Sequence, residues 1–101
     1  MTPGETGTGT AAASERTRVR LLEELGDELV PLGFTVRLSR PRGQSPYLHV
    51  VNPDAAALAE NVLAEESADG WWYRWSWSER IAPAADVAAV AARIARVLAA
   101  R

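Results

Sequence analysis

The chain has 101 residues, of which 48% are hydrophobic and 24% charged, with a formal net charge of −2. This length suits one small domain and is too short for two. The chain has no Cys and all eleven of its basic residues are Arg, which excludes disulfides, thiolate catalysis, Cys-ligated metals and lysine Schiff bases. The one His, His49, leaves no His cluster to ligate a metal. We therefore expect neither a metal nor another cofactor.

No apolar run approaches the roughly 18 residues of a membrane span, and no charged-then-apolar stretch resembles a secretory signal. These features predict a cytoplasmic protein that does not contact a membrane. Acidic residues outnumber basic ones by 13 to 11, so the Arg content does not by itself indicate nucleic-acid binding. An all-Arg, Ala-rich composition is instead typical of a GC-rich genome.

Residues 1–13 are rich in Thr, Gly and Ala and have no bulky apolar side chain after Met1. Such a segment cannot offset its ordering entropy, so we expect a disordered N-terminal tail over residues 1–13. Residues 14–101 are expected to form a single domain. It begins with an amphipathic helix over about 14–30, whose apolar residues recur at spacings of three and four. Pro31 and Gly33 are expected to end this helix, with Gly33 in the left-handed conformation.

The next segment alternates apolar and polar residues over 34–39, which predicts a strand with one buried face. A second strand is expected over 47–51, so that the two form an antiparallel hairpin. Asn52, Pro53 and Asp54 match the residue preferences of a helix N-terminus, and we expect a helix from there to about residue 68. A third strand over 71–78 and a last amphipathic helix beginning near Asp86 complete the domain.

The predicted fold is therefore an α+β, two-layer domain with the element order α-β-β-α-β-α. Its three-stranded, mainly antiparallel sheet would have the helices packed on one face.

All four tryptophans of the chain fall within residues 71–77. Because strand side chains alternate between faces, one set should point into the core, namely Trp71, Tyr73, Trp75 and Trp77. The opposite face would carry Thr35, Arg37, Tyr47, His49, Trp72, Arg74 and Ser76. From this face we take five candidate binding residues: Arg37, Tyr47, His49, Trp72 and Arg74.

Exposed Trp and Tyr beside Arg are typical of binding hot spots. The sequence thus favours a small non-catalytic protein-interaction or regulatory accessory module, which binds a protein partner or self-associates as a homodimer. A first alternative is the stacking of an aromatic small ligand or a single-stranded nucleic acid on the same face, although nucleic acid is disfavoured by the abundant acids. A second alternative is that Arg37 and Arg74 only cover Tyr47 and Trp72 through cation–π contacts.

Catalysis is not expected. His49 lies in the middle of a strand, and no G-x-S-x-G motif is present. The acidic run Glu65, Glu66 and Asp69 is more simply explained as a solvated surface than as an acid/base pair.

The segment Asp69-Gly70-Trp71-Trp72-Tyr73-Arg74-Trp75-Ser76-Trp77, followed by Ile81, Pro83, Asp86 and an Ala-rich helix, resembles small actinobacterial proteins of the streptomycete type that contain a Trp-rich strand. The resemblance covers most of residues 15–100, but only the aromatic strand is distinctive. It implies a cytoplasmic protein and neither a catalytic residue nor a biochemical function.

Overall fold

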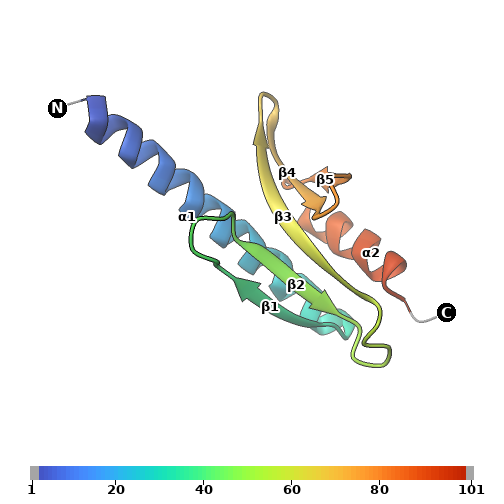
Figure 1. The fold of residues 1–101 in the computed structure, drawn as a ribbon. Coiled ribbons are helices and arrows are strands. Elements are labelled where there is room, and N and C mark those ends of the chain that lie inside the picture. Colours follow the sequence, from blue (N-terminus) through green and yellow to red (C-terminus); the bar gives the residue numbers. More distant parts are fainter. Residues whose placement is uncertain (1–2, 100–101) are drawn as a thin grey trace.

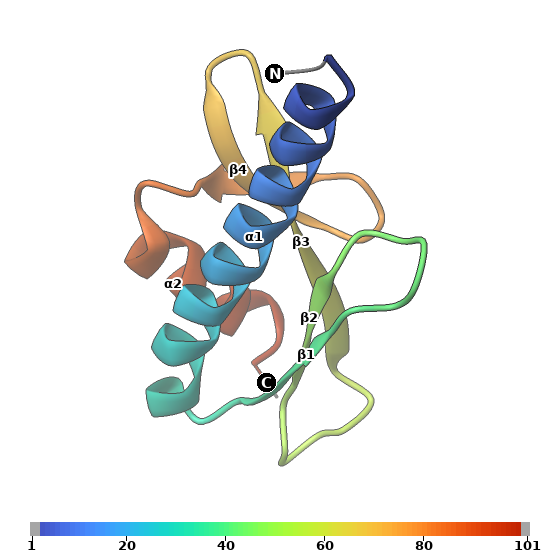
Figure 2. The same ribbon diagram turned by 90° about the vertical axis from the view of Figure 1, so that its left-hand side faces the viewer.

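The computed structural model describes residues 3–99, with side chains from residue 13 onward. In chain order its elements are α1 (Pro3–Leu29), the 3-10 helix η1 (Val30–Leu32), β1 (Thr35–Ser39), β2 (Tyr47–Val51), β3 (Ala59–Ser67), β4 (Gly70–Trp75), β5 (Arg80–Pro83) and α2 (Val87–Val97). The five strands form one antiparallel sheet in the order β1-β2-β3-β4-β5, so that every strand pairs with its neighbours in sequence. Figures 1 and 2 show both helices on the same side of this sheet. The fold is α+β with two layers.

The predicted element order α-β-β-α-β-α and the three-stranded sheet are wrong. The segment expected to be the middle helix contains β3, and a fifth strand, β5, follows β4. Ala and Glu favour a helix locally, but β3 pairs with β2 over residues 59–62 and with β4 over residues 62–67. Val62 and Ala64 alternate toward the core, so the buried face and the two ladders override the local preference.

The residues expected to start the middle helix instead form the loop between β2 and β3. The Asn52 side-chain oxygen accepts a hydrogen bond from the backbone N–H of Asp54 at 2.9 Å, which is an Asx turn. The Asn52 amide nitrogen donates to the carbonyl of Leu98 at 2.8 Å, just beyond α2. Asn52 therefore connects this loop to the end of the last helix.

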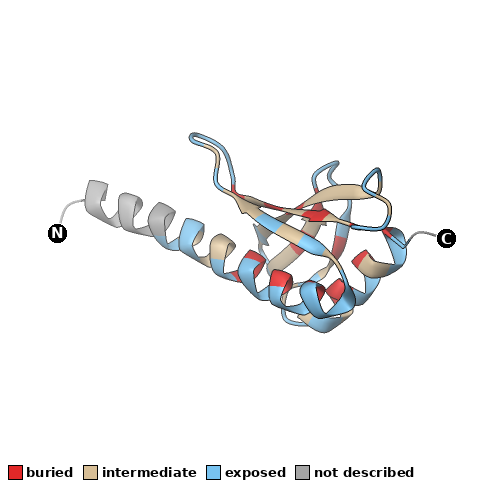
Figure 3. Ribbon diagram, turned by 90° about the horizontal axis from the view of Figure 1, so that it is seen from below, coloured by how far each residue is buried: buried red, intermediate tan, exposed pale blue. Residues whose placement is uncertain are grey.

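The core lies between the helices and the sheet, where Figure 3 shows the buried residues facing one another. It combines leucines of α1, aliphatic residues of β2, β3, β5 and α2, and Tyr73 and Trp75 of β4. Tyr73 is completely buried, and its hydroxyl donates a hydrogen bond to the carbonyl of Leu21 at 2.5 Å. Gly26 lets α1 approach the sheet closely, since a Cβ there would lie 3.3 Å from a methyl group of Val36. The first helix is thus fixed to the sheet both by packing and by one buried hydrogen bond.

At its C-terminal end, α1 passes through η1 to Gly33, which has a φ of 99°. The left-handed conformation expected for Gly33 is confirmed. At the other end, the helical backbone of α1 extends through residues 3–13, which the sequence analysis placed in the tail. Residues 1–2 and the side chains up to residue 12 lie outside the described residues, and disorder over 1–13 stays a prediction. Neither helix within residues 3–99 has the length and apolar character needed to cross a membrane.

Candidate functional site

The face of the sheet opposite the helices, which we call the open face, carries all five predicted binding residues. The strand register pairs Arg37 on β1 with His49 on β2, and His49 in turn with Asn61 on β3. On β4, Arg74 lies opposite Leu63, and Trp72 lies opposite Glu65. Direct cross-strand partners project from the same face, so these side chains form one continuous surface. Their core-facing neighbours on β2, β3 and β4 are buried against the helices.

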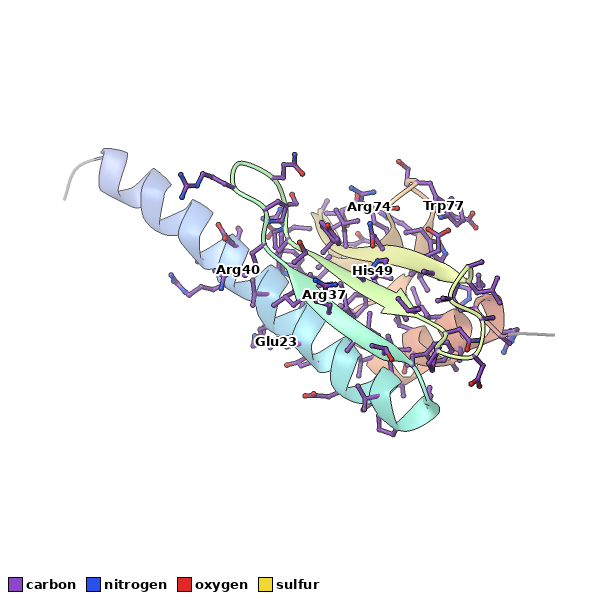
Figure 4. The ribbon with its side chains drawn as sticks, turned by 60° about the horizontal axis from the view of Figure 1, so that its bottom comes forward. Glu23, Arg37, Arg40, His49, Arg74 and Trp77 are labelled. Carbon is purple, nitrogen blue, oxygen red and sulfur yellow. The ribbon has the colours of Figure 1, made fainter. Side chains whose placement is uncertain are left out.

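The β1–β2 half of the open face is hollowed. The hollow has a volume of about 310 Å³ and is lined by Arg37, Ser39, Tyr47, His49 and Asn61. Figure 4 shows Arg37 and His49 close together on neighbouring strands, as their direct pairing requires. The Nδ1 atom of His49 lies 2.7 Å from the side-chain oxygen of Asn61. Three of the predicted residues, Arg37, Tyr47 and His49, therefore meet in one depression.

The β4–β5 half of the open face is a network around Glu65. One carboxylate oxygen of Glu65 lies 3.6 Å from Arg74 Nε, and the other lies 3.4 Å from Arg80 Nη2. The Arg80 guanidinium also covers the Trp72 ring at 4.7 Å from its centroid. Among the described residues, then, Trp72 is covered by Arg80 and not by Arg74. The cation–π cover expected from Arg74 is replaced by its ion pair with Glu65.

The Trp72 indole is also held at its edge by the β3–β4 turn. Its Nε1–H donates to a carboxylate oxygen of Asp69 at 3.3 Å, and the Ser67 hydroxyl donates to the same oxygen at 2.5 Å. These two hydrogen bonds, first that of Ser67 and then that of Trp72, lower the pKa of the exposed Asp69 carboxyl. The sharp turn requires glycine at Gly70, whose φ is 121°.

The charges of the open face are unevenly distributed. Its strands carry three guanidinium groups, those of Arg37, Arg74 and Arg80, and one carboxylate, that of Glu65. Glu65 pairs with the two arginines of the β4–β5 half. Within residues 13–99, no carboxylate lies within 4.0 Å of the Arg37 guanidinium. The carboxylate of Asp69, at the β3–β4 turn beside Trp72, completes the balance of the β4–β5 half, so the excess positive charge lies beside the hollow.

Three residues of the open face were not predicted from the sequence: Asn61, Glu65 and Arg80. Asn61 and Glu65 were assigned to a helix, although their alternation with the buried Val62 and Ala64 was the available signal. Arg80 follows a turn at Ser78 with a positive φ of 89°, and no pattern in so short a strand indicated β5.

Trp77, expected on the core face, lies beyond the end of β4 and is 53% exposed. Its ring stacks on that of the buried Trp75 with a centroid distance of 5.8 Å and an interplanar angle of 4°. Trp77 thus extends the aromatic core toward solvent. It provides an exposed indole just beyond β4, and Figure 4 shows it on the same side of the view as Arg74.

The arrangement is suited to binding by charge and hydrogen bonds. In the part of the chain that the structure describes, no three His, Asp or Glu side chains are grouped to hold a metal ion. The partner of His49 is an amide, which is neither a nucleophile nor an acid. The exposed donors are guanidinium, imidazole and hydroxyl groups, which recognise carboxylate and phosphate oxygens. No family model, curated protein or solved structure matches the chain.

Proposed function

We propose that this protein is a small, non-catalytic interaction module whose open face binds an acidic segment of a partner protein. The observation that carries the proposal is the composition of that face: its strands carry aromatic side chains and three guanidinium groups against one carboxylate, with Asp69 added at the β3–β4 turn. A solvated sheet face is common in antiparallel sheets. Trp, Tyr and Arg together are enriched where such a face binds another protein. We place this function in the cytoplasm, as the composition suggests.

The charge of the open face favours a different protein over a second copy. A symmetric dimer through this face would bring two Arg-rich surfaces together, and juxtaposed like charges cost several kcal/mol. The exposed acids of the chain include Glu23, Glu24, Asp27 and Glu28, which lie on α1 in the other layer. A second copy would therefore have to bind head to tail, and such contacts do not close into a dimer.

The proposal is tested by fluorescence anisotropy with a labelled peptide rich in Glu and Asp. We expect binding that weakens as salt is added. The variant Arg74→Gln removes one positive charge from the open face, and we expect it to weaken binding about fivefold, or about 1 kcal/mol. Arg20→Gln is the matched control, because it removes the same charge from an exposed position on α1. Absence of peptide binding, or an equal loss in both variants, would contradict the proposal.

Stacking of an aromatic ligand or a single-stranded nucleic acid is the second candidate, favoured by the Tyr47 ring that lines the hollow. The Trp72 ring favours it less, because Arg80 already covers one side. A labelled oligothymidylate in the same assay separates the two functions. Binding of the oligonucleotide without binding of the acidic peptide would replace the first proposal by the second. Analytical ultracentrifugation of the protein alone measures its oligomeric state and so detects a second copy bound to the open face.

A further inference from the structure

We infer that the hollow on the β1–β2 half of the open face is a binding site for a single oxyanion, a phosphate or carboxylate group. The inference rests on the proposed function in taking the open face as the binding surface, and it names the group that the surface recognises. It also specifies that the β1–β2 half of the face binds this oxyanion.

The first argument is the unpaired charge of Arg37. The hollow is lined by one guanidinium, one imidazole, two hydroxyls and one amide, and by no carboxylate. On the other half of the face, the carboxylates of Glu65 and Asp69 balance the two arginines: Glu65 pairs with both, and Asp69 binds the Trp72 indole that Arg80 covers. Arg37 is exposed, and no carboxylate among the described residues lies within 4.0 Å of it. A guanidinium fork in this state is free to donate two parallel hydrogen bonds to an oxyanion.

The second argument is the orientation of the imidazole. An amide oxygen only accepts hydrogen bonds, so the 2.7 Å contact with Asn61 Oδ1 places the proton of His49 on Nδ1. The Nε2 atom has no hydrogen-bond partner among the described residues. When the ring is protonated, Nε2 becomes a donor next to the Arg37 guanidinium, and an anion there would contact both groups. When the ring is neutral, Nε2 presents a lone pair that repels the anion.

Among the described residues, no carboxylate lines the hollow around His49. On β1 His49 is paired with Arg37, and on β3 with the neutral Asn61. Tyr47 on its own strand is the other titratable group that lines the hollow, and Tyr47 is paired with Ser39 on β1. The hydroxyls of this second pair supply further donors. The volume of about 310 Å³ exceeds by far the roughly 30 Å³ of one water, so an oxyanion and the group that carries it both have room.

The test uses the fact that His49 is the only His of the chain. Its imidazole proton resonances identify the site in an NMR spectrum without further assignment. We expect inorganic phosphate at pH 6 to shift these resonances saturably in the wild-type protein and in the control Arg20→Gln, which removes the same charge from an exposed position on α1. In Arg37→Gln we expect affinity to fall about tenfold, with an otherwise unchanged spectrum showing that the variant is folded.

A second arm replaces phosphate with acetate, which distinguishes a phosphorylated group from a carboxylate as the source of the oxyanion. A third arm adds the acidic peptide with and without phosphate as competitor. No saturable shift of the His49 resonances, or equal losses in Arg37→Gln and Arg20→Gln, would overturn the anion site. Peptide binding unaffected by Arg37→Gln would overturn it while leaving the interaction module in place. A saturable shift with phosphate, but no binding of the acidic peptide, would support the anion site and contradict the proposal that the partner is an acidic protein segment.

Discussion

Removing the buried hydroxyl of Tyr73 provides a sharp test of how α1 is attached to the sheet. The chain has no Lys and no Cys, so no side-chain amine or thiol contributes to the alkaline pH dependence of its stability. Tyr73 is completely buried and donates to the Leu21 carbonyl. Burial, and to a lesser extent the negative charge of Glu24, raises the pKa of Tyr73 well above its ordinary value of 10.

The sign of the pH effect follows from proton counting. In the unfolded chain Tyr73 loses its proton near pH 10, whereas in the folded protein it keeps the proton to higher pH. The native interaction is therefore fully present below pH 10 and is lost as pH rises toward the raised pKa. The free energy of unfolding falls by about 1.4 kcal/mol per pH unit above pH 10, hence by about 1.4 kcal/mol at pH 11.

The variant Tyr73→Phe removes this dependence along with the hydrogen bond. At pH 7 we expect it to lower the free energy of unfolding by about 1 kcal/mol, the usual worth of one buried hydrogen bond. As the pH rises, the wild-type protein loses stability that the variant does not have. The difference between the two proteins should therefore shrink to about zero by pH 11.

The assay is urea unfolding followed by circular dichroism at pH 7, 9, 10 and 11. Tyr47→Phe is the matched control, since it removes the other tyrosine hydroxyl from the open face. This control should retain the steep alkaline loss that Tyr73 causes. If Tyr73→Phe loses stability above pH 10 as steeply as the wild-type protein, the reasoning is refuted.

Three further predictions concern charge, loop anchoring and the core. Glu65→Gln removes the carboxylate that pairs with both Arg74 and Arg80, so the acidic peptide should bind several-fold tighter in the anisotropy assay. These ion pairs are only partly buried and contribute about 0–1 kcal/mol, so the melting temperature should change little. Unchanged affinity would contradict the role of charge. Asn52→Ala removes both side-chain hydrogen bonds of a buried residue, so the free energy of unfolding measured in urea should fall by roughly 1–3 kcal/mol. A fall of less than about 0.5 kcal/mol would contradict the role of Asn52 in anchoring the loop. Leu25→Ala should lower the free energy of unfolding by about 2–5 kcal/mol in the same assay. Val97→Ala, at a 56% exposed position, should change it by no more than about 0.5 kcal/mol. Equal losses in the two variants would contradict the placement of the core.

The candidate site was largely predictable because it depends on alternation along strands. The period of two placed Trp72 and Arg74 on one face, and the register shows them there together with Arg37, Tyr47 and His49. The partners of these residues were not predictable. Which carboxylate pairs with Arg74, and which cation covers Trp72, depends on strands that pair across the sheet and on the short strand β5.

The sequence by itself determined the two amphipathic helices that flank the strands, the first hairpin and the alternation of the aromatic strand. These features depend on periods of 3.6 and 2 that are visible within a few neighbouring residues. Only the tertiary structure decided that residues 59–67 form a central strand, because its stability comes from ladders with β2 and β4 and from burial of Val62 and Ala64. Local composition favours a helix there, and pairing between separate segments of the chain outweighs that preference. The same pairing brings Asn61 to His49 and leaves Arg37 without a carboxylate partner among the described residues, which is the property on which the proposed binding depends.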